Sequence, residues 1–205
     1  MKPMWTIEGG VDGVRCATPA DEAQIFALLM MMHAEMGFFS VDEAKVIEAI
    51  QIGTQRRGGI TYVIEDNGRV VATLGMVFST EWYSNDEFLA ERWNFVHPDH
   101  RRSDYARMLL EQTKWTHERF KILGKIIPIH IGINSFERTE AKIRLFARHV
   151  PCVGALFVYG ELPRVAVNDK VRAETVKMNQ MNREVNSHKR DRFDARPAVK
   201  AVIRA

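Results

Sequence analysis

The chain has 205 residues, of which 46% are hydrophobic and 27% charged, and its formal net charge is +3. This length and composition predict one domain with a sizeable core plus an appendage. The two cysteines, Cys16 and Cys152, exclude a disulfide framework and favour a reducing cytoplasm. The longest apolar run, residues 25–32, is far shorter than the roughly 20 residues of a membrane span, and the first residues lack a signal-peptide pattern.

The charge is unevenly distributed along the chain. Residues 161–205 contain 11 Lys and Arg against 6 Asp and Glu, which leaves the preceding 160 residues slightly acidic. We therefore expect a folded domain over 1–160 and a basic, partly helical extension over 161–205. Such an extension docks to a protein, binds nucleic acid or is simply solvated. Its single aromatic residue, Phe193, argues against nucleic acid, which stacks its bases on aromatic side chains.

The first predicted elements are a short strand over 14–18 and a helix that opens at Thr18. Thr18 can cap this helix, Pro19 suits its first position, and Asp21 favours its positive end. A second helix is predicted over 42–53. Two β-rich runs then follow, joined by Asn67-Gly68, which is the strongest short-range signal of a hairpin.

Four further elements complete the predicted domain. A strand over 88–96 precedes a helix over 104–123 that Gly124 can end. A buried strand over 125–133, a helix over 138–150 and a last strand over 154–160 follow. This order predicts an α/β fold in which one mixed sheet has helices on its faces.

The stretch "VHPDHRRSDYARMLL", residues 96–110, leads from a strand through a basic turn into a helix. Amide groups of such a turn and of the first helical turn bind anions, aided by the helix dipole. Arg101 and Arg102 add cations that suit a diphosphate, and Ala106 is small enough for close approach. The alternative is a capped helix behind a solvated basic loop.

Asp104 is the unusual residue of this turn, because a carboxylate would repel a diphosphate. Its side chain can turn inward, cap the helix and occupy the amide donors. Alternatively it points outward, since Asp is among the residues that tolerate a left-handed backbone. The sequence leaves both arrangements open.

Three segments in this order resemble the general-control-type N-acetyltransferase superfamily, GNAT. They are "VRCATPADEAQIFALL" from Val14, the turn after Val96, and "NSFERTEAKIRLF" over 134–146. The wording of the last two is also similar to acetyltransferase-like proteins of bacteriophages. The resemblance covers residues 14–160 and implies a mostly antiparallel sheet that binds acetyl-CoA as co-substrate. Its acetyl-CoA loop would comprise Arg101, Arg102, Ser103, Asp104, Tyr105 and Ala106.

The resemblance also implies roles along the strand that precedes the loop. Backbone groups near Phe95 and Val96 would pair with the pantetheine arm, and the Val96 amide would stabilise an oxyanion. Glu91 would be the general base; its alternative is a strand carboxylate paired with a neighbouring Arg or Lys. The family often has a tyrosine as general acid where this chain has Phe146, and Tyr105 could substitute for it.

Four further residues are candidates for supporting roles at the site. Tyr159 is a second possible acid, and Thr139 stands where the family often has an asparagine. His33 and Glu35 lie where relatives shape the acceptor pocket, although a histidine beside a methionine run also fits simple packing. The remaining histidines lack the spacing of metal ligands, so no metal site is predicted.

Two functions follow from these observations. The first is transfer of an acetyl group from acetyl-CoA to a primary amine of a small molecule or protein. The second is a GNAT-fold structural protein without catalysis, for example a bacteriophage virion component docked through 161–205; the departures at Asp104 and Phe146 favour it. The expected location is accordingly the cytoplasm or a virion.

Overall fold

The computed structural model describes residues 9–36, 39–133 and 139–150, without the side chains of Met36, Thr139 and Glu140. The strand expected over 154–160, Tyr159 and the extension 161–205 lie outside these residues. Within them, no helix has the length and apolar character needed to cross a bilayer.

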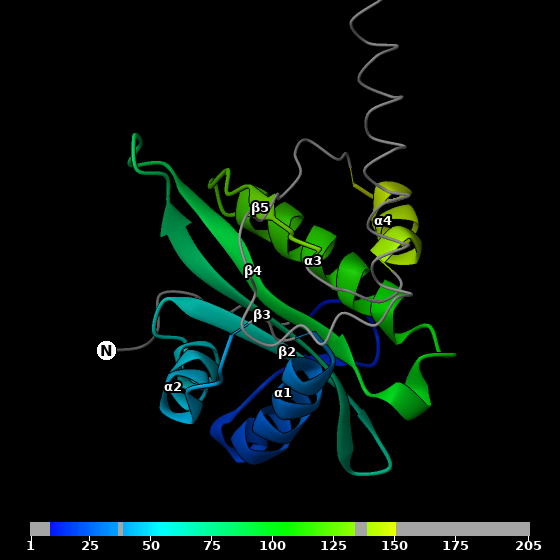
Figure 1. Cartoon of the computed structure of the whole chain (residues 1–205). Helices are drawn as coiled ribbons and strands as arrows, with labels where there is room; N and C mark the ends of the chain where they lie inside the picture. The colour runs from blue at the N-terminus through cyan, green and yellow to red at the C-terminus, as the bar shows by residue number, and fades with distance from the viewer. Residues whose placement is uncertain (1–8, 37–38, 134–138, 151–205) are drawn as a thin grey trace, which may run out of the picture. The chain divides into compact units, whose positions relative to one another are not determined.

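Five strands form one sheet in the order β1-β2-β3-β4-β5 (Figure 1). Neighbouring strands are antiparallel except β4 and β5, which are parallel. The strands are β1 (Val14–Cys16), β2 (Gly59–Asp66), β3 (Arg69–Thr80), β4 (Glu87–Val96) and β5 (Ile129–His130). The helices are α1 (Glu22–Met36), α2 (Glu43–Thr54), α3 (Tyr105–Ile122) and α4 (Thr139–Ala147), with 3₁₀ turns η1 (Pro19–Asp21) and η2 (Pro98–His100).

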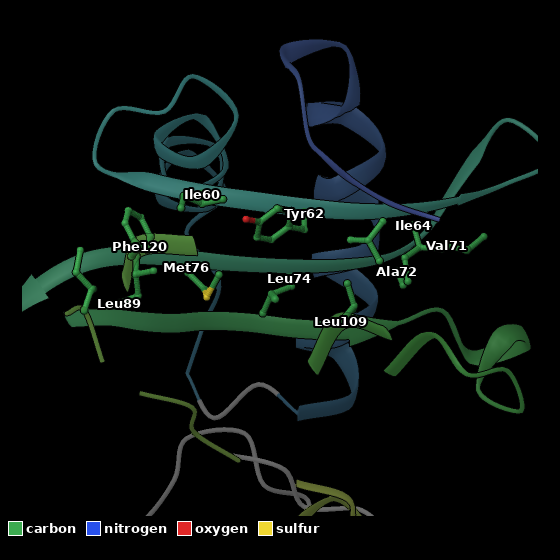
Figure 2. Packing of buried hydrophobic residues seen from close by; sticks show 12 residues of the cluster. Ile60, Tyr62, Ile64, Val71, Ala72, Leu74, Met76, Leu89, Leu109 and Phe120 are labelled. Carbon is green, nitrogen blue, oxygen red and sulfur yellow. The ribbon is translucent and has the colours of Figure 1, made fainter. Parts of the chain in front are cut away.

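Helices cover both faces of this sheet. Figure 1 shows α1 and α2 against one face and α3 against the other. Because side chains alternate along a strand, Val63 packs on the α1 side while its neighbours Tyr62 and Ile64 pack on the α3 side. Figure 2 shows the α3-side core, where Leu109 and Phe120 of α3 meet the sheet. The predicted α/β sheet flanked by helices is therefore confirmed.

Local signals placed the hairpin and the first helix correctly. Asn67 and Gly68 have φ of 50° and 77°, the left-handed pair that a two-residue hairpin turn requires. Pro19 opens η1, and the Asp21 carboxylate accepts the Thr18 amide at 2.8 Å. Hydrogen bonds from Arg15 hold the pKa of Asp21 at about 2.

The predicted buried strand over 125–133 is wrong in extent. The structure has only β5, Ile129–His130, and leaves the Ile126 side chain 81% exposed. Pro128 has no N–H to donate to a ladder, so pairing begins after it. Its carbonyl oxygen still accepts the Leu89 amide at 2.9 Å.

Candidate functional site

A β-bulge divides β4 at Arg92. Gly75 of β3 pairs with Trp93, but the next residue, Met76, pairs with Glu91, so Arg92 is the extra residue. Gly75 is needed here because a Cβ would overlap the Trp93 indole, whose Nε1 donates to Thr73 Oγ1 at 3.2 Å. The bulge reverses the alternation of side chains, which sends Trp93 to the α1-side core.

The two halves of β4 differ in their outer neighbour. In the closed half, residues 87–90, Leu89 and Ala90 pair with β5. In the open half, residues 91–96, no strand of the described chain pairs with the outer edge. An open edge of this kind can accept an extended ligand as an additional strand.

The hydrogen-bond register shows which backbone groups reach the open edge. The His97 amide donates to the Val71 carbonyl at 2.8 Å, so His97 faces β3. Alternation along an antiparallel pair then turns Phe95 to β3 and Val96 to the open edge. Of the two strand residues expected at a cofactor, only Val96 presents its amide there.

Glu91 lies at the start of the open half with its carboxyl group partly buried. Its cross-strand partner Met76 belongs to the α3-side core, so Glu91 faces the same side. Burial raises the pKa of Glu91 to about 8. It forms no ion pair with any described residue, which argues against the alternative of a strand carboxylate paired with Arg or Lys.

The β4–α3 loop, residues 97–104, folds through η2 and a polar turn. The Ser103 Oγ donates to the His100 carbonyl at 2.6 Å and accepts the Tyr105 amide at 3.3 Å. The Met108 amide donates to the Asp104 carbonyl. Among the described residues, no acceptor is found for the amides of Ala106 and Arg107 in the first turn of α3.

The Asp104 side chain points outward. It stands at the N-cap position of α3 without a side-chain capping bond, and its carboxylate accepts a 2.7 Å hydrogen bond from Arg107. Its φ of −82° is not left-handed, so the turn needs no special backbone there. Asp104 therefore leaves the helical amide donors accessible, and of the two arrangements open from the sequence the outward one is observed.

The two arginines of the β4–α3 loop differ in their contacts. Arg102 is exposed and has no ion pair within the described chain. The Arg101 guanidinium instead contacts both carboxylate oxygens of Glu35 on α1, at 2.6 and 2.5 Å. It also lies 5.6 Å from the centre of the Phe95 ring. Only Arg102 is immediately available to an anion.

The other predicted residues have contacts of their own. Tyr105 is partly buried and stacks on His100 with ring centres 6.0 Å apart. Phe146 is a partly buried residue of α4, and α4 is tied to α3 by a 3.0 Å contact between His149 and Glu111. His33 Nε2 lies 2.7 Å from the Phe39 carbonyl oxygen, which favours its packing role. No group of metal-ligating side chains occurs in the described residues.

Two features of the site had no counterpart in the sequence predictions. The first is the Arg101–Glu35 contact, whose partners are 66 positions apart. The second is an open hollow of about 670 Å³ at the closed half of β4. Its lining includes Glu81, Asp86 and Glu87, which the sequence shows only as a polar stretch between strands. The hollow lies at the opposite end of β4 from the β4–α3 loop.

The mostly antiparallel sheet with helices on both faces matches the fold of solved acetyltransferases. The acetyltransferase (GNAT) domain family model matches residues 57–149, a range that holds Glu91, Val96 and the whole loop. This match agrees with the resemblance to GNAT seen in the sequence.

Solved structures agree on the fold. A protein described as a possible acetyltransferase from Clostridium difficile is 15% identical, with a TM-score of 0.55 over 74% of this chain and 98% of that one. An aminoglycoside 6'-N-acetyltransferase from Acinetobacter haemolyticus is 16% identical, with a TM-score of 0.53 over 72% and 97%. At such identities the likeness shows the fold alone. No curated protein matches the sequence.

Proposed function

We propose that this chain is an acetyl-CoA-dependent N-acetyltransferase that acts on a primary amine of a small molecule or protein. One observation carries the proposal: β4 brings together a partly buried carboxyl group without an ion pair in the described chain, an open backbone edge and a loop with an exposed arginine. Each feature alone has a structural explanation. Their succession from Glu91 to Arg107 is the arrangement that acyl transfer from a diphosphate-bearing thioester requires.

The residues present fit acetyl-CoA as a substrate. The amides of Ala106 and Arg107 and the side chain of Arg102 suit its diphosphate. The open edge beside Val96 suits the amide groups of its pantetheine arm, which pair as an added strand. Asp104 does not obstruct these donors, because its carboxylate is held by Arg107.

The chemistry assigns a role to each group. Glu91 in its ionised form takes a proton from the acceptor ammonium, directly or through water, and the neutral nitrogen attacks the thioester carbonyl carbon. The Val96 amide donates to the carbonyl oxygen as it gains charge. The C–S bond then breaks, and the nitrogen, now bonded to the acetyl carbon, loses its second proton to solvent. The CoA thiolate leaves and takes a proton from solvent. A thiol pKa near 8.5 makes this departure feasible without a tyrosine at Phe146.

The raised pKa of Glu91 predicts the pH dependence of the reaction. At neutral pH most Glu91 is protonated and cannot act as a base. As pH rises through about 8 the carboxylate forms, so kcat/KM for the amine should rise and then level off.

The test compares Glu91→Gln with Glu87→Gln, which removes a carboxylate from the closed half of the same strand. Assays would use acetyl-CoA with a panel of amines that includes polyamines, aminoglycosides and peptides. We expect Glu91→Gln to lose about 100-fold in kcat/KM together with the rise near pH 8, and Glu87→Gln to keep both. Equal activity of both variants, or no binding of CoA at millimolar concentration by calorimetry, would refute the proposal.

A second candidate is a GNAT-fold structural protein without catalysis, for example a virion component docked through 161–205. The observation that favours it is Phe146, which has no proton to give. This candidate predicts that CoA binding and acetyl transfer are both absent, and that removal of 161–205 abolishes an assembly. Location in the cytoplasm or in a virion follows whichever function holds.

A further inference from the structure

The contact between Arg101 and Glu35 joins the β4–α3 loop to the C-terminal turn of α1. One guanidinium nitrogen reaches both carboxylate oxygens, and the two side chains are only 32% and 37% exposed. The guanidinium rests over the Phe95 ring, which belongs to the α1-side core. Arg101 is therefore held on the α1 side of the sheet.

This position conflicts with binding of a diphosphate. The amides of Ala106 and Arg107, for which the described residues supply no acceptor, begin α3, which covers the opposite face. To add its charge to an anion held there, the guanidinium has to leave Glu35. The Arg101 amide is fixed to the Pro98 carbonyl at 3.3 Å, so the change falls on the side chain, whose rotatable bonds allow it.

We infer that Glu35 competes with the CoA diphosphate for Arg101, and that binding of CoA releases the last turn of α1. This inference rests on the proposed function, because it takes acetyl-CoA as the ligand of the loop. The released turn is otherwise held by its own hydrogen bonds and by His33, whose ring lies 2.7 Å from the Phe39 carbonyl oxygen. Binding of CoA to the β4–α3 loop is thereby coupled to release of the last turn of α1.

The coupling has a definite consequence for affinity. A ligand that needs Arg101 free binds more weakly in proportion to the fraction of molecules in which Arg101 is already held. Removing the Glu35 charge should therefore tighten CoA binding by about 3- to 10-fold. A pantetheine probe, which has no diphosphate, should bind the variant and the parent chain equally.

The experiment is calorimetry on the full chain with CoA and with pantetheine. The variants are Glu35→Gln, Arg101→Gln and the double variant, and Glu48→Gln on α2 controls for loss of a surface carboxylate without a contact to Arg101. We expect tighter CoA binding only for Glu35→Gln. Arg101→Gln should weaken CoA binding, and the Glu35 substitution should then have no effect in the double variant. Thermal unfolding checks that each variant is folded.

Hydrogen exchange distinguishes the inferred coupling from a contact that only stabilises the fold. CoA should speed exchange of the amides of residues 33–36 in the parent chain, and Glu35→Gln should show that faster exchange without ligand. Unchanged or weaker CoA binding by Glu35→Gln, or slower exchange at these amides on binding, would overturn the inference while leaving the proposed function intact. If the parent chain itself fails to bind CoA, the proposed function fails first.

Discussion

The two halves of β4 are made of the same strand but present opposite surfaces. In the closed half the Leu89 amide donates to the Pro128 carbonyl oxygen, and β5 pairs with the outer edge. Glu81, Asp86 and Glu87 line an open hollow there. In the open half the edge has no partner among the described residues, and the loop beyond it carries Arg101 and Arg102. The two halves meet where β5 ends at His130, opposite Ala90, just before the bulge at Arg92.

The difference shows how one strand can be paired on both edges in one half and on one edge in the other. Backbone groups that pair with a neighbouring strand stabilise the sheet but are lost to a ligand. The bulge at Arg92 lets β4 keep its ladder with β3 while its outer edge changes from paired to open.

Removing the Val96 amide from the open half of β4 should have the largest effect on catalysis. Val96→Pro removes the one amide that we assign to the oxyanion, and its ladder with β3 survives because Val96 faces away from β3. We expect a loss of roughly 100- to 1,000-fold in kcat. Val96→Ala shortens the side chain but keeps the amide, and should stay within a few-fold of the parent. Similar rates for both variants in a thiol-release assay would show that the edge amide is not used.

The buried carboxyl group of Glu91 should make stability fall with pH. Below about pH 4.5 Glu91 is protonated in both the folded and the unfolded chain. Between about pH 4.5 and 8 only the unfolded chain releases this proton, so the folded state loses stability as pH rises. At about 1.4 kcal/mol per pKa unit the upper limit is near 5 kcal/mol, and solvent screening of a partly exposed group makes the contribution smaller. Glu91→Gln should thus stabilise the protein more at pH 9 than at pH 4 in urea unfolding. An equal effect at both pH values would mean that Glu91 is solvated.

The bulge itself can be tested through the glycine beneath Trp93. In Gly75→Ala the added methyl group overlaps the indole, which must move or strain the strand. We expect a loss of about 1–3 kcal/mol in the free energy of unfolding. Gly68→Ala, in the open hairpin turn, is the comparison: its Cβ meets nothing, and only the positive φ opposes it, at about 1 kcal/mol. A smaller loss for Gly75→Ala than for Gly68→Ala would contradict the tight packing at the bulge.

The smallest effect is expected at Asp104. Asp104→Asn removes a negative charge near the bound diphosphate without removing a cap of the helix amides, since its side chain bonds only to the Arg107 side chain among the described residues. CoA should bind about 2- to 3-fold more tightly at low salt, and the gain should vanish at high salt. Asp86→Asn removes the same charge at the closed half and should leave the affinity unchanged. A large loss of affinity in Asp104→Asn would show that this carboxylate supports the loop.

Much of the fold was predictable because its signals are local. The Asn67-Gly68 turn, Pro19 at the start of the first helix and Gly124 at the end of α3 act through backbone geometry within a few residues. The strand over 125–133 was overestimated because its apolar run hid the effect of Pro128. The position of Glu91 before the loop was also readable, but its environment was not.

The sequence by itself determined the order of elements, the basic turn before α3 and the types of side chain available to the site. The tertiary structure alone decided that Asp104 turns outward, that Arg101 is held by Glu35, and that burial raises the pKa of Glu91 to about 8. The physical reason is the distance along the sequence over which each kind of interaction acts. Turns and caps are set by neighbouring residues, whereas pairing of charges and loss of solvent depend on segments that only folding brings together.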